Sequence, residues 1–223
     1  MPTELDTIKS LSIVMLGNFN PTIFQPYWFS AKELIREEES SNAKIQVIHS
    51  SLVQFELDWV SFLITKEKFQ VITTKESYFD IVKDLVISTF KILSETPIDA
   101  LGINHTHNFT LKDSANYSRF GQWLGNLSIW QESVPESTLL TLEIFHSKKE
   151  NGELGSQKIR ITPSDLPNLN YGVAIDFNEH IQLKPSTNSK KELILMLEKN
   201  WKPSSIEAKK IISNLWKQFQ QIQ

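Results

Sequence analysis

The chain has 223 residues, of which 40% are hydrophobic and 22% charged, and its formal net charge at pH 7 is −3. This length and composition allow a sizeable core, in one large domain or two small ones. The absence of cysteine excludes disulfides, thiolate catalysis and Cys-based metal sites. No run of about 18 apolar residues occurs and residues 1–6 do not resemble a signal peptide, so we expect a cytoplasmic protein without a membrane segment.

The N-terminal region predicts strands and one helix. The apolar run 11–16 indicates a buried strand. Pro26 suits the first turn of a helix, which we expect to run into the acidic residues 37–39, where three carboxylates oppose the helix dipole. Residues 44–59 alternate between apolar and polar side chains and predict two strands. The alternation changes phase near 58–61, which predicts a bulge or turn there.

The centre of the chain predicts a strand–helix–strand unit. Residues 62–64 and 69–73 indicate two strands joined by a short link. A helix is predicted over 77–95, because apolar residues recur there at three- and four-residue steps after a capping-box-like start. Pro97 ends this helix, and residues 98–105 predict the next strand.

A further helix is predicted over 113–125, capped by Asp113 or Ser114. Residues 133–137 are the best linker candidate. Three alternating segments follow and predict an antiparallel meander: 140–144, 159–161 and 171–177. Two helices are predicted to close the chain, over 190–199 and from Ser204 onward.

Together these patterns predict an α+β fold. An N-terminal mixed sheet, covered by helices and including the strand–helix–strand unit, precedes the antiparallel meander and two C-terminal helices. Residues 1–130 would form the N-terminal α+β part and residues 131–223 the meander with its helices. The alternative is one continuous domain.

The middle of the chain resembles a family of sporadically distributed, uncharacterised bacterial proteins. The resemblance rests on four segments: 53–59, 69–73, 77–95 and 97–104. In that family a strand carries a glycine, an apolar residue and an Arg-Tyr pair before an asparagine. Residues 102–104 are Gly-Ile-Asn and lack the Arg-Tyr pair. The resemblance implies a bacterial origin and supplies neither a reaction nor catalytic residues.

His105 and His107 are the candidates for a metal site. Residues two apart on a strand project from one face, so both imidazoles can reach the same ion. A third ligand is needed, and the histidines and carboxylates considered are His49, His146, His180, Glu56, Asp58 and Glu143. That metal site would make the protein a metal-dependent hydrolase or nuclease. The alternative is that both histidines complete a buried strand, since Leu101, Ile103 and Phe109 share their face.

The C-terminal tail is basic. Residues 184–223 carry eight lysines and three glutamates, or +5, which leaves −8 for the rest of the chain. Aromatic residues lie among these lysines, a combination in which rings stack on bases while lysines meet phosphates. A nucleic-acid-binding module would use four of them: Lys202, Lys209, Lys210 and Lys217. The same charge also fits an acidic partner, or the acidic body of the chain itself.

The last predicted helix carries an apolar stripe longer than anchoring to its own domain requires. We predict that this stripe binds a partner through Ile211, Leu215, Trp216, Phe219 and Ile222. Lysines on the opposite face would contact the acidic body of a second copy. The sequence therefore predicts a homodimer packed across a two-fold axis.

Signature motifs of common enzyme classes are absent: the nucleophile elbow, the phosphate-binding loop, the dinucleotide fingerprint and the zinc-protease helix. Seven glycines in the whole chain also argue against a cofactor cradled by backbone, so we expect no cofactor and no catalytic residues. The resulting hypothesis is a non-enzymatic interaction or accessory subunit of a bacterial multi-protein system, such as a defence system. It would bind protein partners and a second copy of itself.

Overall fold

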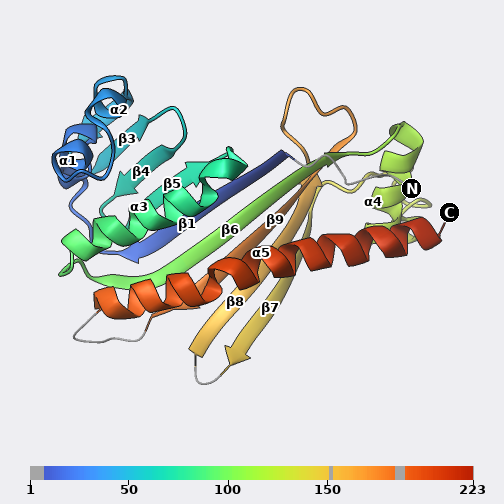
Figure 1. Cartoon of the computed structure of the whole chain (residues 1–223). Helices are drawn as coiled ribbons and strands as arrows, with labels where there is room; N and C mark the ends of the chain where they lie inside the picture. The colour runs from blue at the N-terminus through green and yellow to red at the C-terminus, as the bar shows by residue number, and fades with distance from the viewer. Residues whose placement is uncertain (1–7, 151–152, 184–188, 223) are drawn as a thin grey trace.

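The computed structural model describes residues 8–150, 153–183 and 189–222, which form one nine-stranded sheet with helices packed against it (Figure 1). The predicted α+β class is confirmed. The strands are β1 (Ile8–Gly17), β2 (Lys44–His49), β3 (Leu52–Glu56), β4 (Ser61–Thr65), β5 (Lys68–Thr73), β6 (Ile98–Thr110), β7 (Leu142–Glu150), β8 (Glu153–Pro163) and β9 (Gly172–Gln182). The α-helices are α1 (Pro26–Ala31), α2 (Glu37–Ser41), α3 (Phe79–Ile92), α4 (Ser114–Gly125) and α5 (Ser189–Gln221).

The strand order is β2-β3-β4-β5-β1-β6-β9-β8-β7, and every neighbouring pair is antiparallel. The predicted mixed sheet is therefore antiparallel throughout the described chain. The strand–helix–strand unit exists as β5, α3 and β6, and its two strands run in the same direction. However, β1 lies between them and pairs antiparallel with both, so no parallel pair forms.

The two halves of the chain repeat one arrangement. Each half runs from a first strand through a helical segment and a meander to a longer helix: β1, α1–α2, β2–β5 and α3, then β6, α4, β7–β9 and α5. In each half the first strand pairs with the last strand of the meander, as β1·β5 and β6·β9. The first strands pair antiparallel with each other at the centre of the sheet, so the halves are related by an approximate two-fold axis.

Buried side chains form two apolar clusters. The first contains a group of phenylalanines from the N-terminal half: Phe19, Phe24, Phe29, Phe55, Phe62, Phe69 and Phe90. The second lies in the C-terminal half and includes Phe109, Phe120, Phe177 and Phe219. Helix α5 contributes to both, with Leu197 in the first cluster and Ala208 in the second. The predicted division of the chain at residue 130 stays a prediction. Hydrogen bonds between β6 and β9 place strands from both sides of that boundary in one sheet.

Several local predictions correspond to elements of the structure. The expected turn near 58–61 joins β3 to β4, where the Leu57 amide donates to the Val60 carbonyl. Asp113 caps α4 by accepting the Asn116 amide at 2.8 Å. The predicted meander is β7–β9. The capping box predicted for α3 does not form, because the N-cap is Tyr78 and Asp80 instead accepts a hydrogen bond from the Trp201 indole at 2.7 Å.

The helix predicted from Pro26 to the acidic residues is in fact two short helices. Glu33 adopts a left-handed backbone conformation, with φ of 58°, which ends the first helix. Arg36 then begins a new one, where its amide donates to the Glu39 carboxylate at 2.8 Å. The three glutamates thus lie in the first turn of α2, where the helix dipole favours them.

The two predicted C-terminal helices are one helix, α5, of 33 residues with Pro203 inside it. The predicted start of a second helix at Ser204 is wrong, because Ser204 lies inside α5, which continues through Pro203 although proline removes one intrahelical hydrogen bond. Tertiary contacts on both sides keep the helix continuous, because Trp201 and Ser204 are buried against α3 and β6. Charged residues interrupt α5 throughout, and no helix in the described part of the chain is long and apolar enough to cross a membrane.

Candidate interaction surfaces and ligand pocket

His105 and His107 lie in the middle of the molecule, between β6 and α5. Their exposed fractions are 5% and 4%. The Nε2 atom of His105 lies 2.9 Å from the Ser204 hydroxyl, which donates its proton to the Trp201 carbonyl at 3.0 Å. The imidazole therefore acts as the donor toward Ser204. His107 packs edge-on against Phe177.

Both imidazoles are held in the neutral form. Burial lowers the pKa of His105 from 6.5 to about 4, with a smaller contribution from the Lys209 charge. Burial likewise lowers the pKa of His107 to about 4, and the charges of His105, Lys9 and Lys209 act in the same direction against a weaker effect of Glu76. Neutral imidazoles are suitable metal ligands, so the question of a metal site depends on a third donor.

The described residues do not supply that third donor. No group of three or more His, Cys, Asp or Glu side chains lies close enough to hold an ion within residues 8–150, 153–183 and 189–222. His49 and Glu56 belong to strands at one end of the sheet and His146 to the edge strand at the other, whereas β6 is central. His180 is paired with Gly102, which places it on the opposite face of the sheet from His105.

The apolar stripe of α5 packs against the chain's own second cluster. Phe219 is 1% exposed and contacts the rings of Phe120 and Trp123. Ile211, Leu215 and Trp216 are partly buried in the same cluster. Ile222 is 48% exposed and is the member of the predicted partner surface that remains open. The stripe therefore anchors α5 to its own sheet.

The outward face of α5 is basic. We call it the α5 ridge, and its exposed members are Leu195, Lys202, Ile206, Lys209, Lys210 and Lys217. All four lysines predicted to bind nucleic acid thus lie on one exposed face. Ile206 is 65% exposed among them, so the ridge combines positive charge with an apolar contact point.

An acidic groove lies between α2 and α3. Its carboxylates come from Glu33, Glu37, Glu39 and Asp84, with Arg36 as the one basic lining residue, and Ile81 adds an exposed apolar side chain. Trp59 forms part of the floor, where its indole donates to Glu39 at 2.7 Å and its ring stacks on Tyr78. The groove and the α5 ridge have opposite charge, and each includes an exposed isoleucine.

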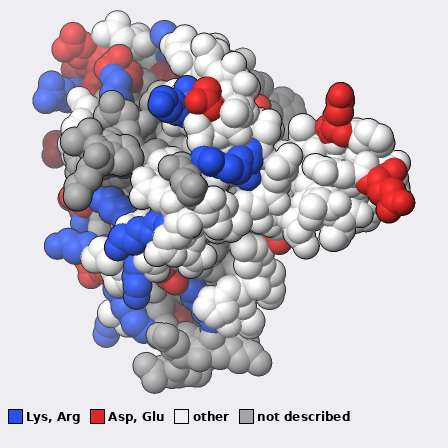
Figure 2. All heavy atoms as spheres, turned by 90° about the vertical axis from the view of Figure 1, so that its right-hand side faces the viewer, with Lys and Arg blue, Asp and Glu red and all other residues white. Residues whose placement is uncertain are grey.

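The connection between α4 and β7, residues 126–141, exposes several large apolar side chains. Four large side chains point to solvent within it: Ile129 (68% exposed), Trp130 (54%), Val134 (51%) and Leu140 (76%). Figure 2 views the end of the molecule that carries α4 and the end of α5, where uncharged residues cover a broad area and basic residues gather to one side. The sequence predicts residues 133–137 to be a linker. The apolar side chains that flank this segment, Ile129, Trp130 and Leu140, are the signal that the connection is a surface.

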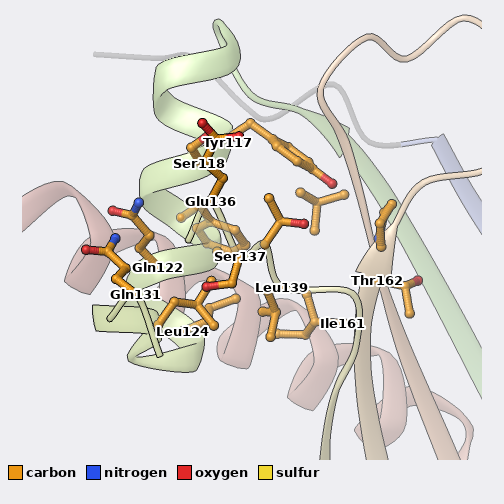
Figure 3. A pocket seen from close by; sticks show the side chains of 16 residues that line it. Tyr117, Ser118, Gln122, Leu124, Gln131, Glu136, Ser137, Leu139, Ile161 and Thr162 are labelled. Carbon is orange, nitrogen blue, oxygen red and sulfur yellow. The ribbon is translucent and has the colours of Figure 1, made fainter. Parts of the chain in front are cut away.

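A pocket of about 310 Å³ lies beneath the same connection (Figure 3). Tyr117 and Gln122 of α4 form one wall, and Ile161 and Thr162 of β8 form the other, while Ser137 lies between them. Ligand pockets measure roughly 300–1,000 Å³, so this one has the size of a small-molecule site. The α4–β7 connection therefore has a buried side that lines a pocket and an exposed side that is apolar.

Comparison with known proteins does not assign a function to these surfaces. No protein-family model matches the chain, and no curated protein matches it. The functional argument therefore starts from the α4–β7 connection, the α5 ridge with the acidic groove, and the pocket.

Proposed function

We propose that this chain is a non-enzymatic interaction or accessory subunit that binds a protein partner through the α4–β7 connection. The observation that carries the proposal is the group of four exposed apolar side chains in residues 126–141. Exposed apolar patches commonly mark protein interfaces, and tryptophan is enriched among residues that dominate binding energy. Together with the family resemblance of the central strands, this favours a role in a bacterial multi-protein system such as a defence system.

The neighbouring edge strand extends this surface. The connection leads directly into β7, which, among residues 8–150, 153–183 and 189–222, has a hydrogen-bonded neighbour on one side only. Phe145 and Ile144 of this strand are 69% and 46% exposed. An exposed strand edge can accept an extended segment of a partner through backbone hydrogen bonds. The proposed partner surface therefore consists of an apolar anchor region followed by a strand edge.

Replacing Trp130 by Ala is expected to abolish partner binding without unfolding the chain. Truncation of a central interface tryptophan costs about 2 kcal/mol or more, which is roughly a 30-fold loss of affinity. The partner is isolated by co-purification of the full chain from its native host, and its affinity for the purified variants is then measured calorimetrically. Tyr27 is 78% exposed and lies outside this surface, so Tyr27→Ala is the matched control. Equal losses in both variants, or no loss in Trp130→Ala, would contradict the proposed surface.

We further propose that two copies associate through the α5 ridge and the acidic groove. Each copy offers one ridge and one groove, so a two-fold dimer can bury both pairs at once. Ile206 and Ile81 supply an exposed apolar side chain to each surface, and the charges of Lys209 and Lys210 complement those of Glu33 and Asp84. This arrangement replaces the predicted dimer contact, because the stripe that was to form it packs against the chain's own core.

The ridge–groove dimer predicts an association that depends on salt and charge. Light scattering should give a mass near twice 25.7 kDa at about 50 mM salt and a lower mean mass at about 500 mM. Reversing two ridge charges, Lys209→Glu with Lys210→Glu, should yield the monomer at low salt. The control reverses two exposed lysines elsewhere, Lys66→Glu with Lys112→Glu, and should leave the dimer intact. A 25.7 kDa species at every salt concentration would refute self-association.

Nucleic acid is the second candidate ligand of the α5 ridge, because its four lysines are exposed together. Phosphate contacts make nucleic-acid affinity fall steeply with salt. Each phosphate contact lowers the affinity roughly tenfold when the salt concentration rises tenfold. Glu207 in the same helix forms an ion pair with Lys148 of β7, so its negative charge is compensated there and not by the ridge lysines. Binding of mixed DNA or RNA by the native chain, lost on Lys209→Glu with Lys210→Glu, would favour this function over self-association.

A further inference from the structure

The pocket beneath the α4–β7 connection is lined by neutral groups. Among its sixteen described lining residues, hydroxyls and amides supply most of the polar atoms: Tyr117, Ser118, Gln122, Gln131, Ser137, Thr138 and Thr162. Glu136 is the one carboxylate, and none of these residues is Lys, Arg or His. An anionic ligand would therefore leave water without a compensating positive charge, which is costly. The lining selects against phosphates and carboxylates.

One polar atom of the pocket lacks a partner. The Ser137 hydroxyl is buried and makes no hydrogen bond within the described residues. Buried hydroxyls in folded proteins nearly always have a partner, and leaving one unpaired costs free energy. Ser137 lies in the centre of the pocket lining, between the walls that α4 and β8 provide (Figure 3), and its hydroxyl is covered in this conformation, so a ligand reaches it once the side chain turns toward the cavity. It can donate to a ligand and also accept from it.

The remaining lining is apolar. Phe120, Leu124, Leu139 and Ile161 supply large hydrophobic surfaces. A ligand that fills about 310 Å³ must therefore present a ring-sized apolar part to these side chains and a polar group to Ser137.

We propose that this pocket binds an uncharged, amphipathic small molecule, with an apolar ring against the α4 and β8 walls and a hydroxyl or amide group hydrogen-bonded to Ser137. This assigns a small-molecule ligand, which goes beyond the proposed protein partner. The same connection forms the pocket wall and the exposed apolar surface, so an occupied pocket holds the wall residues Gln131 and Leu139 in one arrangement. Ligand and partner are then coupled through residues 126–141.

The test uses a matched series of probes on the purified full chain: benzamide and benzyl alcohol, which are uncharged, and benzoate, which has a similar size and a negative charge. Amide chemical shifts measured by NMR should change around the pocket with benzamide or benzyl alcohol, with Kd on the order of 1 mM for molecules of this size. Benzoate should bind at least about tenfold more weakly. Equal binding of all three probes, or shifts confined to other regions, would overturn the proposal.

Two substitutions locate the site. A Cβ atom on Gly121 meets Leu139 at 3.4 Å, an ordinary contact, so Gly121→Ala should fold and still bind benzamide, whereas Gly121→Met should fill the pocket and abolish the shifts. Ser137→Ala removes the unpaired hydroxyl, so it should weaken benzamide binding severalfold while the melting temperature stays equal or rises. Unchanged benzamide binding in both Gly121→Met and Ser137→Ala would overturn the assignment. Partner affinity, measured with Trp130→Ala, is a separate readout. A negative result for ligand binding in the pocket would therefore not contradict the proposed partner surface.

Discussion

Replacing Phe90 by Ala is expected to lower the free energy of unfolding by about 3–5 kcal/mol. Phe90 lies on α3 and is 1% exposed. Its ring contacts Phe69 edge-on, with centroids 5.1 Å apart, and it also contacts Phe19 and Phe24. The substitution removes a large apolar surface from the first cluster and leaves a cavity that strands and helix cannot close, because both are fixed by backbone hydrogen bonds.

Chemical denaturation of the full chain measures this loss, and an exposed site of the same residue type provides its control. Phe145 on β7 is 69% exposed, so Phe145→Ala should change the free energy of unfolding by less than about 1 kcal/mol. Phe90→Leu retains much of the volume and should fall between the two. A loss below about 1 kcal/mol for Phe90→Ala would mean that α3 is not packed on the sheet.

Local patterns predicted most elements of the fold because their signals are local. Periodicity alone identifies α3, and the Asp113 cap identifies the start of α4. The position of β1 between β5 and β6 could not be read in this way, since it depends on pairing across more than fifty residues of sequence. The continuity of α5 through Pro203 was also hidden, because it depends on the burial of Trp201 and Ser204 against other elements.

The candidate site was less predictable than the fold. An apolar stripe indicates that a helix packs, without indicating which surface it packs on, and Phe219 faces the chain's own cluster. Residues 133–137 read as a linker because serine and proline dominate them, yet Ser137 lines the pocket. The alternation of β6 correctly placed His105 and His107 on one face, and the alternative of two buried histidines describes their surroundings. No local sequence pattern predicts this pocket, because its lining comes from segments that are separate in the sequence: α4, the α4–β7 connection and the strands β8 and β9.

The chain is expected to lose stability on acidification through the protonation of its two buried histidines. The pKa of both His105 and His107 is about 4 in the folded chain, against 6.5 for the exposed side chain. Below about pH 6.5 the unfolded chain binds protons that the folded chain does not, so the free energy of unfolding falls as pH decreases from about 6.5 to about 4. It levels off below that window. The shift corresponds to about 3 kcal/mol for each histidine.

A buried carboxylate opposes this trend. Burial raises the pKa of Glu179, although hydrogen bonding and charge from Lys148 act against that rise, so Glu179 takes up its proton more readily in the folded chain. Its contribution lies above its ordinary pKa of 4.5 and has the opposite sign to that of the histidines, so it offsets part of the stability that they lose. Substituting the two histidines separates their contribution from that of Glu179.

Urea titrations of the full chain at intervals between pH 7 and 4 measure this dependence. The double substitution His105→Gln with His107→Gln should flatten it, because glutamine cannot titrate, even if the variant is less stable at pH 7. His49 is exposed on β2, so His49→Gln is the matched control and should retain the wild-type slope. A wild-type stability that is constant over this range would show that the imidazoles are not kept neutral by burial. A slope that disappears only after treatment with a chelator would instead indicate that both histidines hold a metal ion, because bound metal must compete with protons for the same nitrogens.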